Sequence, residues 1–189
     1  DIAKGVHCIR NTVEYKNIQT GDIQVMRGYG TGFAMQYVDG RTYIVTNAHV
    51  VQAPSVVMAR TSDGIQLYKY HDQKVTLVDN KDDVNTLDDI DAIPVSSDED
   101  KDLALLEVHD KLHVSKAYSR SPVSSRVGDT VYIIGYPAAR FKARTKGNTI
   151  MNRAIMGKDK VDIIDITMTF GNSGSPYFLR DDRGRIFFG

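Results

Sequence analysis

Short runs of β-branched and aromatic residues recur along the whole chain, each bounded by Gly, Asp, Asn or Pro. Such runs are typical of strands, and segments with the periodicity of a long helix are scarce. The first half contains predicted strands at 5–15, 32–37, 41–46, 56–60, 65–70, 74–78 and 103–108. The second half contains predicted strands at 130–134, 148–156, 160–167, 175–179 and 185–188. Because no helix-length segment separates these strands, the pattern favours antiparallel barrels over a parallel sheet.

A polar connector at 111–128 divides the strand-rich sequence into two halves. We therefore predict an all-β protein with an N-terminal barrel at 1–115 and a C-terminal barrel at 116–189. A chain of 189 residues with 41% hydrophobic content is long enough to bury a core. Its apolar runs are far shorter than the roughly 20 residues that cross a bilayer, so no membrane span is predicted.

Charge and cysteine content narrow the range of partners. The 24 Lys and Arg residues balance 24 Asp and Glu residues, which gives a formal net charge of +0 and a pI of about 7.1. No global electrostatic field then draws the chain to nucleic acid or to an anionic membrane. The single cysteine, Cys8, cannot form an internal disulfide and is predicted to be an ordinary strand residue.

Two charged segments interrupt the strand pattern. The segment 79–102 is strongly acidic and predicts a solvated surface loop, with a calcium site or a partner site as the alternatives. In the segment 140–146, four basic residues alternate with uncharged ones and would line one face of an extended segment: Arg140, Lys142, Arg144 and Lys146. A solvated face is again favoured, and contact with an acidic substrate or partner is the alternative.

The segment GNSGSP at 171–176 is the strongest candidate for chemistry. Serine proteolysis needs a hydroxyl activated by an imidazole, a carboxylate that orients the imidazole, and backbone N–H donors for the oxyanion. The flanking glycines would let the backbone turn sharply, so that Ser173 projects from a bend and the N–H groups of Gly171 and Ser173 converge. Taken alone, the segment is equally compatible with an ordinary turn, because Gly, Asn and Ser dominate turns.

A histidine and an aspartate in the first half stand where they could complete such a site. His49 follows an apolar run in a small-residue corner, and Asp102 immediately precedes the apolar run 103–106. A carboxylate at the start of such a strand is costly to bury without a partner, and a His N–H would be a suitable one. The other histidines lie in polar or charged surroundings and are expected at the surface: His7, His71, His109 and His113.

Together these segments resemble the chymotrypsin-like (trypsin-type) serine peptidases, most closely the bacterial HtrA-like proteases and the glutamyl endopeptidases. The resemblance covers nearly the whole chain, from about 5 to 189. Four motifs carry it in the family's order: GTGF at 30–33, TNAHVV at 46–51, DLALL at 102–106 and GNSGSP at 171–176. GYP at 135–137 is a weaker fifth match. The order His, Asp, Ser distinguishes this family from subtilisin-like and α/β-hydrolase arrangements.

The resemblance implies two six-stranded antiparallel β-barrels with the active site in the cleft between them. It implies a serine endopeptidase that forms an acyl-enzyme intermediate. Ser173 would be the nucleophile, His49 the general base and Asp102 the orienting carboxylate. Asp100 is the rival for the last role, but it lies in a run that predicts solvent exposure. The implied oxyanion hole comprises Gly171, Asn172 and Ser173.

The residues that would bind substrate are Thr167, Met168, Thr169 and Phe170. In the family, the residue six positions before the nucleophile lies at the floor of the specificity pocket. Thr167 provides no carboxylate there, so we expect small or aliphatic side chains rather than Arg or Lys at the cleaved position. Glutamate stays open by resemblance to the glutamyl endopeptidases. Asn172 replaces the Asp that animal digestive members pair with a freed N-terminal amine, so no activating cleavage is expected.

Two other functions stay open: a binding or scaffold module with an unorganised triad, and an esterase that uses the same apparatus. The expected partner is a protein or peptide substrate, without nucleic acid and without a metal or organic cofactor. The resemblance leaves an oligomer or appended domains open and favours a periplasmic or secreted location. Five strands are predicted in the second half where the resemblance implies six. We therefore expect an incomplete second barrel, whose last strand comes from beyond Gly189 or from another chain.

Overall fold

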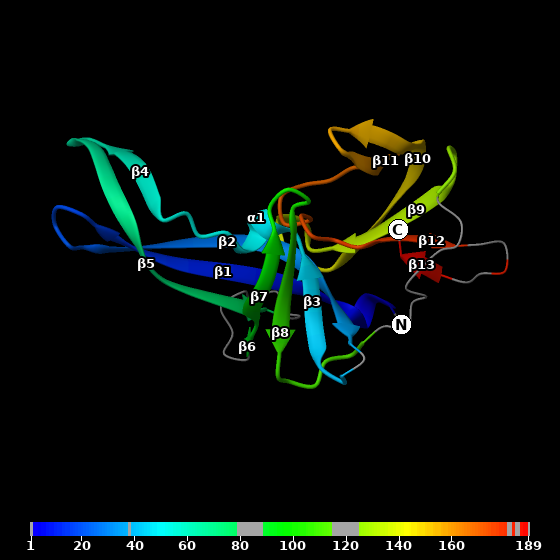
Figure 1. Ribbon diagram of the computed structural model, residues 1–189, viewed down its shortest axis with the longest axis horizontal. Coiled ribbons are helices and arrows are strands. Elements are labelled where there is room, and N and C mark those ends of the chain that lie inside the picture. The colour runs from blue at the N-terminus through cyan, green and yellow to red at the C-terminus, as the bar shows by residue number, and fades with distance from the viewer. Residues whose placement is uncertain are drawn as a thin grey trace.

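The structure is a computed structural model that describes residues 2–37, 39–78, 89–114, 125–180, 183 and 186–188. These residues form two β-sheets with only short helical turns between strands (Figure 1). The all-β class predicted from the strand pattern is confirmed. None of the helices in the described ranges is long and apolar enough to cross a membrane.

The first sheet has eight strands in the order β4-β5-β1-β2-β3-β8-β7, with β6 paired to β5. These strands are β1 (Val6–Asn17), β2 (Ile23–Gln36), β3 (Thr42–Thr46), β4 (Val56–Thr61), β5 (Gly64–Leu77), β6 (Ile90–Asp91), β7 (Ile93–Asp98) and β8 (Leu103–Val108). Ala92, between β6 and β7, donates its N–H to the carbonyl of Val75 on β5. Because β6 pairs with β5 while β7 pairs with β8, the sheet curls round on itself into the first barrel.

The second sheet has five antiparallel strands in the order β11-β10-β9-β12-β13. These strands are β9 (Thr130–Gly135), β10 (Ala143–Met156), β11 (Asp159–Asp165), β12 (Tyr177–Arg180) and β13 (Ile186–Phe188). Within the part of the chain that the structure describes, no ladder joins β11 to β13, so this sheet is open. The second barrel is therefore incomplete, as the strand count predicted.

Alternating burial gives the first sheet its core face. In β8, Ala104, Leu106 and Val108 are buried, and the residues between them are more exposed. Their side chains belong to one cluster with Ile9 of β1 and Ile44 of β3. Strand residues two apart point to the same face of a sheet, so this pattern is what turns the apolar side of β8 inward.

A second cluster joins the two sheets. Val6 and Cys8 of β1 pack against Ile134, Tyr136 and Phe178 of the second sheet and the segment after β9. Both faces of β1 are therefore covered over its first residues, and their burial pattern does not alternate. Cys8 is a buried strand residue, as predicted.

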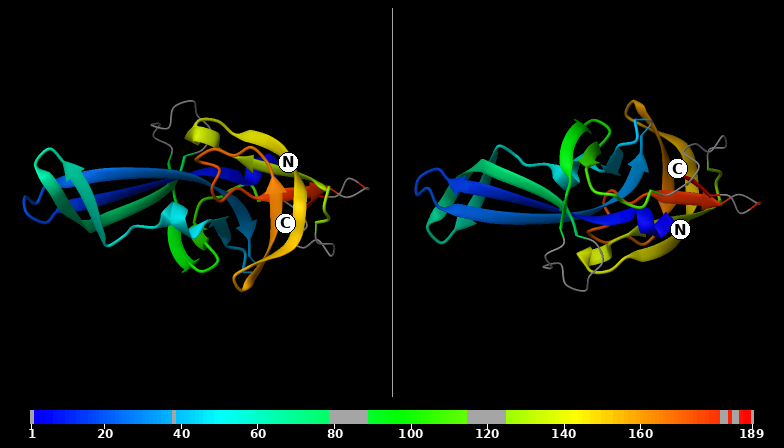
Figure 2. Two further views of the ribbon diagram at one scale, coloured as in Figure 1. Left: turned by 90° about the horizontal axis from the view of Figure 1, so that it is seen from above. Right: turned by 90° about the horizontal axis from the view of Figure 1, so that it is seen from below.

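The β1–β2 and β4–β5 hairpins extend beyond the barrel and project from one side of the molecule (Figures 1 and 2). β1 stays paired with β2 along this whole length. A small core cluster that includes Val13, Tyr15 and Tyr68 lies in this projecting arm.

The structure differs from the predicted strands in four main places. β10 begins at Ala143 instead of 148, because its first residues pair with β9. β2 begins at Ile23 instead of 32, because its first half pairs with β1 along the projecting arm. The predicted strands 65–70 and 74–78 form one continuous strand, β5. Residues 90–98 of the acidic segment, predicted as a loop, form β6 and β7, because pairing with β5 and β8 holds them extended. The remaining segments 79–88 and 115–124 lie outside the described residues.

One histidine prediction is wrong. His7 is only 2% exposed, because it lies in the stretch of β1 that both sheets cover. His71, His109 and His113 are exposed, as predicted. The described strands of the first sheet end at Val108 and those of the second begin at Thr130, and the division of the chain at 115 stays a prediction.

Candidate active site

His49 lies on a single helical turn that follows directly from β3. Asn47 is the N-cap residue, and the helix α1 covers Ala48–Val51. Ala48, Val50 and Val51 are buried and anchor the turn in the first sheet, whereas the side chain of His49 is 51% exposed. The small-residue corner in the sequence thus holds the histidine at the surface on a fixed backbone.

Both oxygens of the Asp102 carboxylate contact His49. The ring Nδ1 lies 2.7 Å from Oδ2, and the backbone N–H of His49 donates to Oδ1 at 2.9 Å. Because an ionised carboxylate can only accept hydrogen bonds, the proton of the neutral ring lies on Nδ1 and Nε2 keeps its lone pair. The side chain of Asp102 is 44% exposed, so the pair is accessible from solvent.

The backbone of Asp102 adopts an unusual conformation just before β8. Its φ of 51° lies in the left-handed region, which costs a non-glycine residue on the order of 1–2 kcal/mol. Asn47 Nδ2 donates to the Asp102 carbonyl at 2.8 Å and holds that conformation. Asp100, the rival carboxylate, instead forms an ion pair with Lys158 at 2.7 Å.

Ser173 lies in a tight turn between Gly171 and Gly174, whose φ values are 89° and 83°. A Cβ at Gly171 would overlap the carbonyl oxygen of Tyr136, and a Cβ at Gly174 would overlap the carbonyl oxygen of Thr31. Both positions therefore require glycine, for the backbone conformation and for space.

The peptide before Gly171 has a defined orientation. The carbonyl of Phe170 accepts a hydrogen bond from the N–H of Ala138 at 2.8 Å. All described peptides are trans, and in a trans peptide the N–H points opposite to the carbonyl. The N–H of Gly171 therefore faces away from Ala138.

The three amides of the predicted oxyanion hole differ in availability. The N–H of Asn172 donates to the carbonyl of Thr169 at 3.3 Å, so it is committed to the turn. Neither the N–H of Gly171 nor that of Ser173 has an acceptor among the described residues. These two amides are free to bind an oxygen supplied by a ligand.

Thr31 of β2 connects the Ser173 turn to the first sheet. Its N–H donates to the carbonyl of Ser173 at 2.7 Å, and its hydroxyl donates to the carbonyl of Gly171 at 2.7 Å. The same hydroxyl accepts the N–H of Tyr136 at 3.0 Å. The sequence interpretation gave Thr31 no individual role, although the GTGF motif at 30–33 was the signal that could have found it.

The turn with Ser173 and the helix with His49 both lie against the same residue, Gly30. A Cβ at Gly30 would lie 2.5 Å from Val50 Cγ1 and 3.1 Å from the carbonyl oxygen of Ser173. Since Val50 directly follows His49, the two predicted catalytic segments lie next to each other on the same side of β2. Among the described residues no hydrogen bond joins the side chains of Ser173 and His49. Of the three predicted catalytic side chains, those of His49 and Asp102 are the pair in direct contact.

The four predicted substrate-binding residues join β11 to the Ser173 turn and are all exposed. Met168 is 49% exposed and Phe170 is 71% exposed. Thr167 and Thr169 lie beside them in the same segment. In the described ranges, no group of three or more His, Cys, Asp or Glu side chains is placed to hold a metal ion.

Comparison with known proteins identifies the family. Residues 30–187 match the model of the trypsin-like peptidase domain. The chain belongs to this family. The Serine protease Do-like HtrA of Bacillus subtilis (strain 168) is 29% identical over 167 residues, which is 82% of this chain and 32% of that protein. The trypsin-like peptidase domain described here thus spans about a third of the length of this curated relative.

Two solved structures share the fold of this trypsin-like peptidase domain. Deg5 has a TM-score of 0.58 at 23% identity, over 97% of this chain and 77% of that chain. Rv3671c from M. tuberculosis H37Rv, in an inactive mutant form, has a TM-score of 0.57 at 19% identity, over 98% of this chain and 76% of that chain. The two sheets therefore form a chymotrypsin-like two-barrel fold with an incomplete second barrel, as the motifs implied.

Proposed function

We propose that this trypsin-like peptidase domain is a serine endopeptidase that acts through Ser173, His49 and Asp102. One observation carries the proposal: both oxygens of Asp102 contact His49, which leaves Nε2 of the ring as the proton acceptor. The turn with Ser173 and the helix with His49 lie next to each other beside Gly30. A relative that is named a serine protease supports the same activity.

The proposed reaction begins when Ser173 Oγ attacks the carbonyl carbon of the scissile peptide bond and His49 Nε2 accepts the hydroxyl proton. The oxyanion that forms accepts hydrogen bonds from the free amides of Gly171 and Ser173. His49 then protonates the leaving amine as the C–N bond breaks, which leaves an acyl-enzyme on Ser173. Water attacks this ester, with His49 as its base, and frees Ser173. Asp102 stays ionised and stabilises the charged ring.

We propose that the residue on the acyl side of the cleaved bond is small or aliphatic. The segment of Thr167, Met168 and Thr169 precedes the Ser173 turn and contains no carboxylate to pair with a basic side chain. Phe170 extends the apolar character of this segment and is well exposed. A lysine or arginine at this position would then lose its hydration without gaining an ion pair.

The test combines labelling and proteolysis. A fluorescent fluorophosphonate reacts only with an activated serine, so the wild-type chain should be labelled and should degrade unfolded casein. Ser173→Ala should lose labelling and reduce turnover by roughly 10⁴-fold to 10⁶-fold, with an unchanged unfolding midpoint.

Ser175→Ala is the matched control. It removes a second hydroxyl of the same turn, and that hydroxyl is buried without a hydrogen-bond partner among the described residues. Labelling of Ser175→Ala should equal that of the wild type. A wild-type chain that is folded but neither labelled nor active would contradict the enzyme proposal and leave a binding module.

A further inference from the structure

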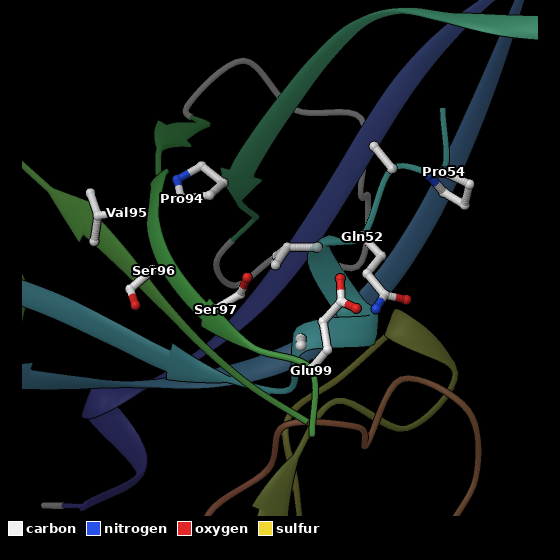
Figure 3. A pocket seen from close by; sticks show the side chains of 10 residues that line it. Gln52, Pro54, Pro94, Val95, Ser96, Ser97 and Glu99 are labelled. Carbon is white, nitrogen blue, oxygen red and sulfur yellow. The ribbon is translucent and has the colours of Figure 1, made fainter. Parts of the chain in front are cut away.

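A pocket of about 690 Å³ lies beside α1, between the chain that follows His49 and the strand β7 (Figure 3). Ala48, Val51 and Ala53 form apolar parts of its lining, and two prolines, Pro54 and Pro94, add rigid apolar walls. In Figure 3 the labelled side chains lie around α1, with Pro94 and Val95 to its left and Pro54 to its right, and the loops of the second sheet lie below α1. No residue of the segment 167–170, which precedes the Ser173 turn, lines this pocket.

Glu99 supplies the charge of this pocket. Its side chain lies beside α1, and the side chain of Gln52 lies on the far side of Glu99 from β7 (Figure 3). The acidic residues around Glu99 all have partners, since Asp98 pairs with Lys101 at 3.3 Å, Asp100 with Lys158 and Asp102 with His49. Glu99 has no ion pair or side-chain hydrogen bond among the described residues. Three neighbouring carboxylates thus have ion-pair partners within the protein, whereas the carboxylate of Glu99 in the pocket has none among the described residues.

We propose that this pocket binds a lysine or arginine side chain of the polypeptide substrate. The inference rests on the proposed function for the identity of the polypeptide as a substrate. The aliphatic stem of the basic residue would pack on the apolar side chains that line the pocket, as long basic side chains do on apolar surfaces. The charged group would pair with Glu99, and the amide oxygen of Gln52 would accept a further N–H from it.

The position of the pocket makes the basic residue a second recognition element. Ala48 directly precedes His49, and Glu99 lies three residues before Asp102, so the pocket borders the elements that hold the predicted catalytic pair. A polypeptide cleaved at Ser173 would reach the pocket with a side chain several residues away from the cleaved bond. Selection at the cleaved bond and selection at this pocket would then be independent.

A peptide array tests the proposal. Each peptide carries small and aliphatic residues and one arginine, which is moved through every position, and a parallel set carries norleucine instead. The wild-type chain should cleave one arginine position roughly two- to fivefold faster than its norleucine counterpart, which is the range of a solvent-accessible ion pair. Glu99→Gln should remove this preference, and Glu99→Lys should transfer it to a glutamate at the same position.

Asp63→Asn is the matched control, because it removes an exposed carboxylate in the distant β4–β5 turn. It should keep the wild-type preference. A preference that survives in Glu99→Gln, or a wild-type chain that does not distinguish arginine from norleucine at any position, overturns the pocket assignment.

Binding to the inactive Ser173→Ala chain separates this proposal from the proposed function. The same peptides, labelled for fluorescence anisotropy, should bind Ser173→Ala with an arginine preference that is lost in Ser173→Ala/Glu99→Gln. Equal affinity for the arginine and norleucine peptides refutes the pocket, even where the wild type cleaves. A preference seen in binding without any cleavage by the wild type supports the pocket and refutes the enzyme.

Discussion

At the residue scale, Asp102 combines a strained backbone with a fully used carboxylate. Its positive φ is held by the side chain of Asn47, which lies two residues before His49 and bonds the Asp102 carbonyl. Asn47 therefore positions both His49 and Asp102. It precedes His49 closely in the chain, and it bonds the backbone of Asp102. Loss of this bond would free the backbone of Asp102 to relax and would turn its carboxylate away from Nδ1.

Asn47→Ala should lower kcat of the proposed peptidase by roughly 10-fold to 100-fold with little change in KM, because an ångström-scale misplacement of a catalytic group is costly. Asn47→Asp keeps the size of the side chain but cannot donate to the carbonyl, so it should not restore kcat. Steady-state kinetics on a fluorogenic peptide give the two constants. Asn17→Ala, at the tip of the projecting arm, is the control for a general effect of losing an asparagine. A parallel rise of KM would point instead to a role in substrate binding.

Most residues of the candidate site could be named from sequence because each stands in a short motif. His49, Asp102 and Ser173 lie next to apolar runs or between glycines, and those local patterns are visible without a structure. The contacts of Thr31 were not predictable, because its hydroxyl bonds a carbonyl 140 positions away. The predicted exposure of His7 was wrong for the same reason, since the second sheet that buries it is distant in sequence.

At the element scale, strands with alternating burial were predictable and strands without it were not. β8 was predicted with its observed bounds because its buried and exposed residues alternate. β7 is exposed along its whole length, so its sequence carries no such signal and its acidic residues indicated a loop. Its strand conformation comes from pairing with β8, which is a tertiary effect.

One carboxylate holds several elements of the second sheet together. Asp162 of β11 accepts hydrogen bonds from Ser125, from Tyr177 of β12 at 3.2 Å and from the N–H of Arg153 in β10 at 3.0 Å. Burial raises the pKa of Asp162, but the hydrogen bonds from Ser125, Arg153 and Tyr177 outweigh it, so the pKa is lowered overall. Burial and the Asp162 charge raise the pKa of Tyr177 to about 12.

These pKa shifts predict how stability depends on pH. A carboxylate whose pKa is lowered by folding stabilises the protein above its unfolded pKa, and this contribution is lost as pH falls through the folded pKa. Asp162→Asn should therefore reduce the free energy of unfolding at pH 7, by about 1 kcal/mol because solvent screens this partly exposed carboxylate. The difference from wild type should shrink as the pH is lowered below about 4, the ordinary Asp value.

Urea unfolding of both chains across this pH range measures the difference. Asp165→Asn is the control, because Asp165 is an exposed carboxylate at the end of the same strand. Its effect should be small at every pH. A loss in Asp162→Asn that is the same at pH 7 and pH 3 would mean that side-chain shape, not charge, accounts for the stabilisation.

At the scale of the whole molecule, the candidate site depends on how the two sheets meet. The motifs predicted which halves carry the chemistry, and an incomplete second barrel followed from the strand count. The interface itself was not predictable, because it is built from contacts between distant segments. Val6 and Phe178 belong to one buried cluster, and Lys142 donates to the carbonyl of Ala3 at 2.6 Å. Lys158 pairs with Asp100 across the same boundary.

Thr31 is the polar link of that interface that lies closest to the proposed oxyanion site. Thr31→Val keeps the shape of the side chain but removes the donor to the Gly171 carbonyl and the acceptor of the Tyr136 N–H. Two buried backbone groups would lose a partner, so the free energy of unfolding should fall by about 1–3 kcal/mol. Labelling by a fluorophosphonate should slow by roughly 10-fold to 100-fold, because the turn with Ser173 would no longer be fixed to the first sheet.

Thr76→Val is the matched control for this substitution. Thr76 is 2% exposed, and its hydroxyl has no hydrogen-bond partner among the described residues. Burying a methyl group in place of an unsatisfied hydroxyl should leave labelling unchanged and should not reduce stability. If Thr31→Val were destabilised but labelled at the wild-type rate, Thr31 would only hold the sheets together. Slowed labelling in a chain that remains folded instead requires that the first sheet positions the serine of the second.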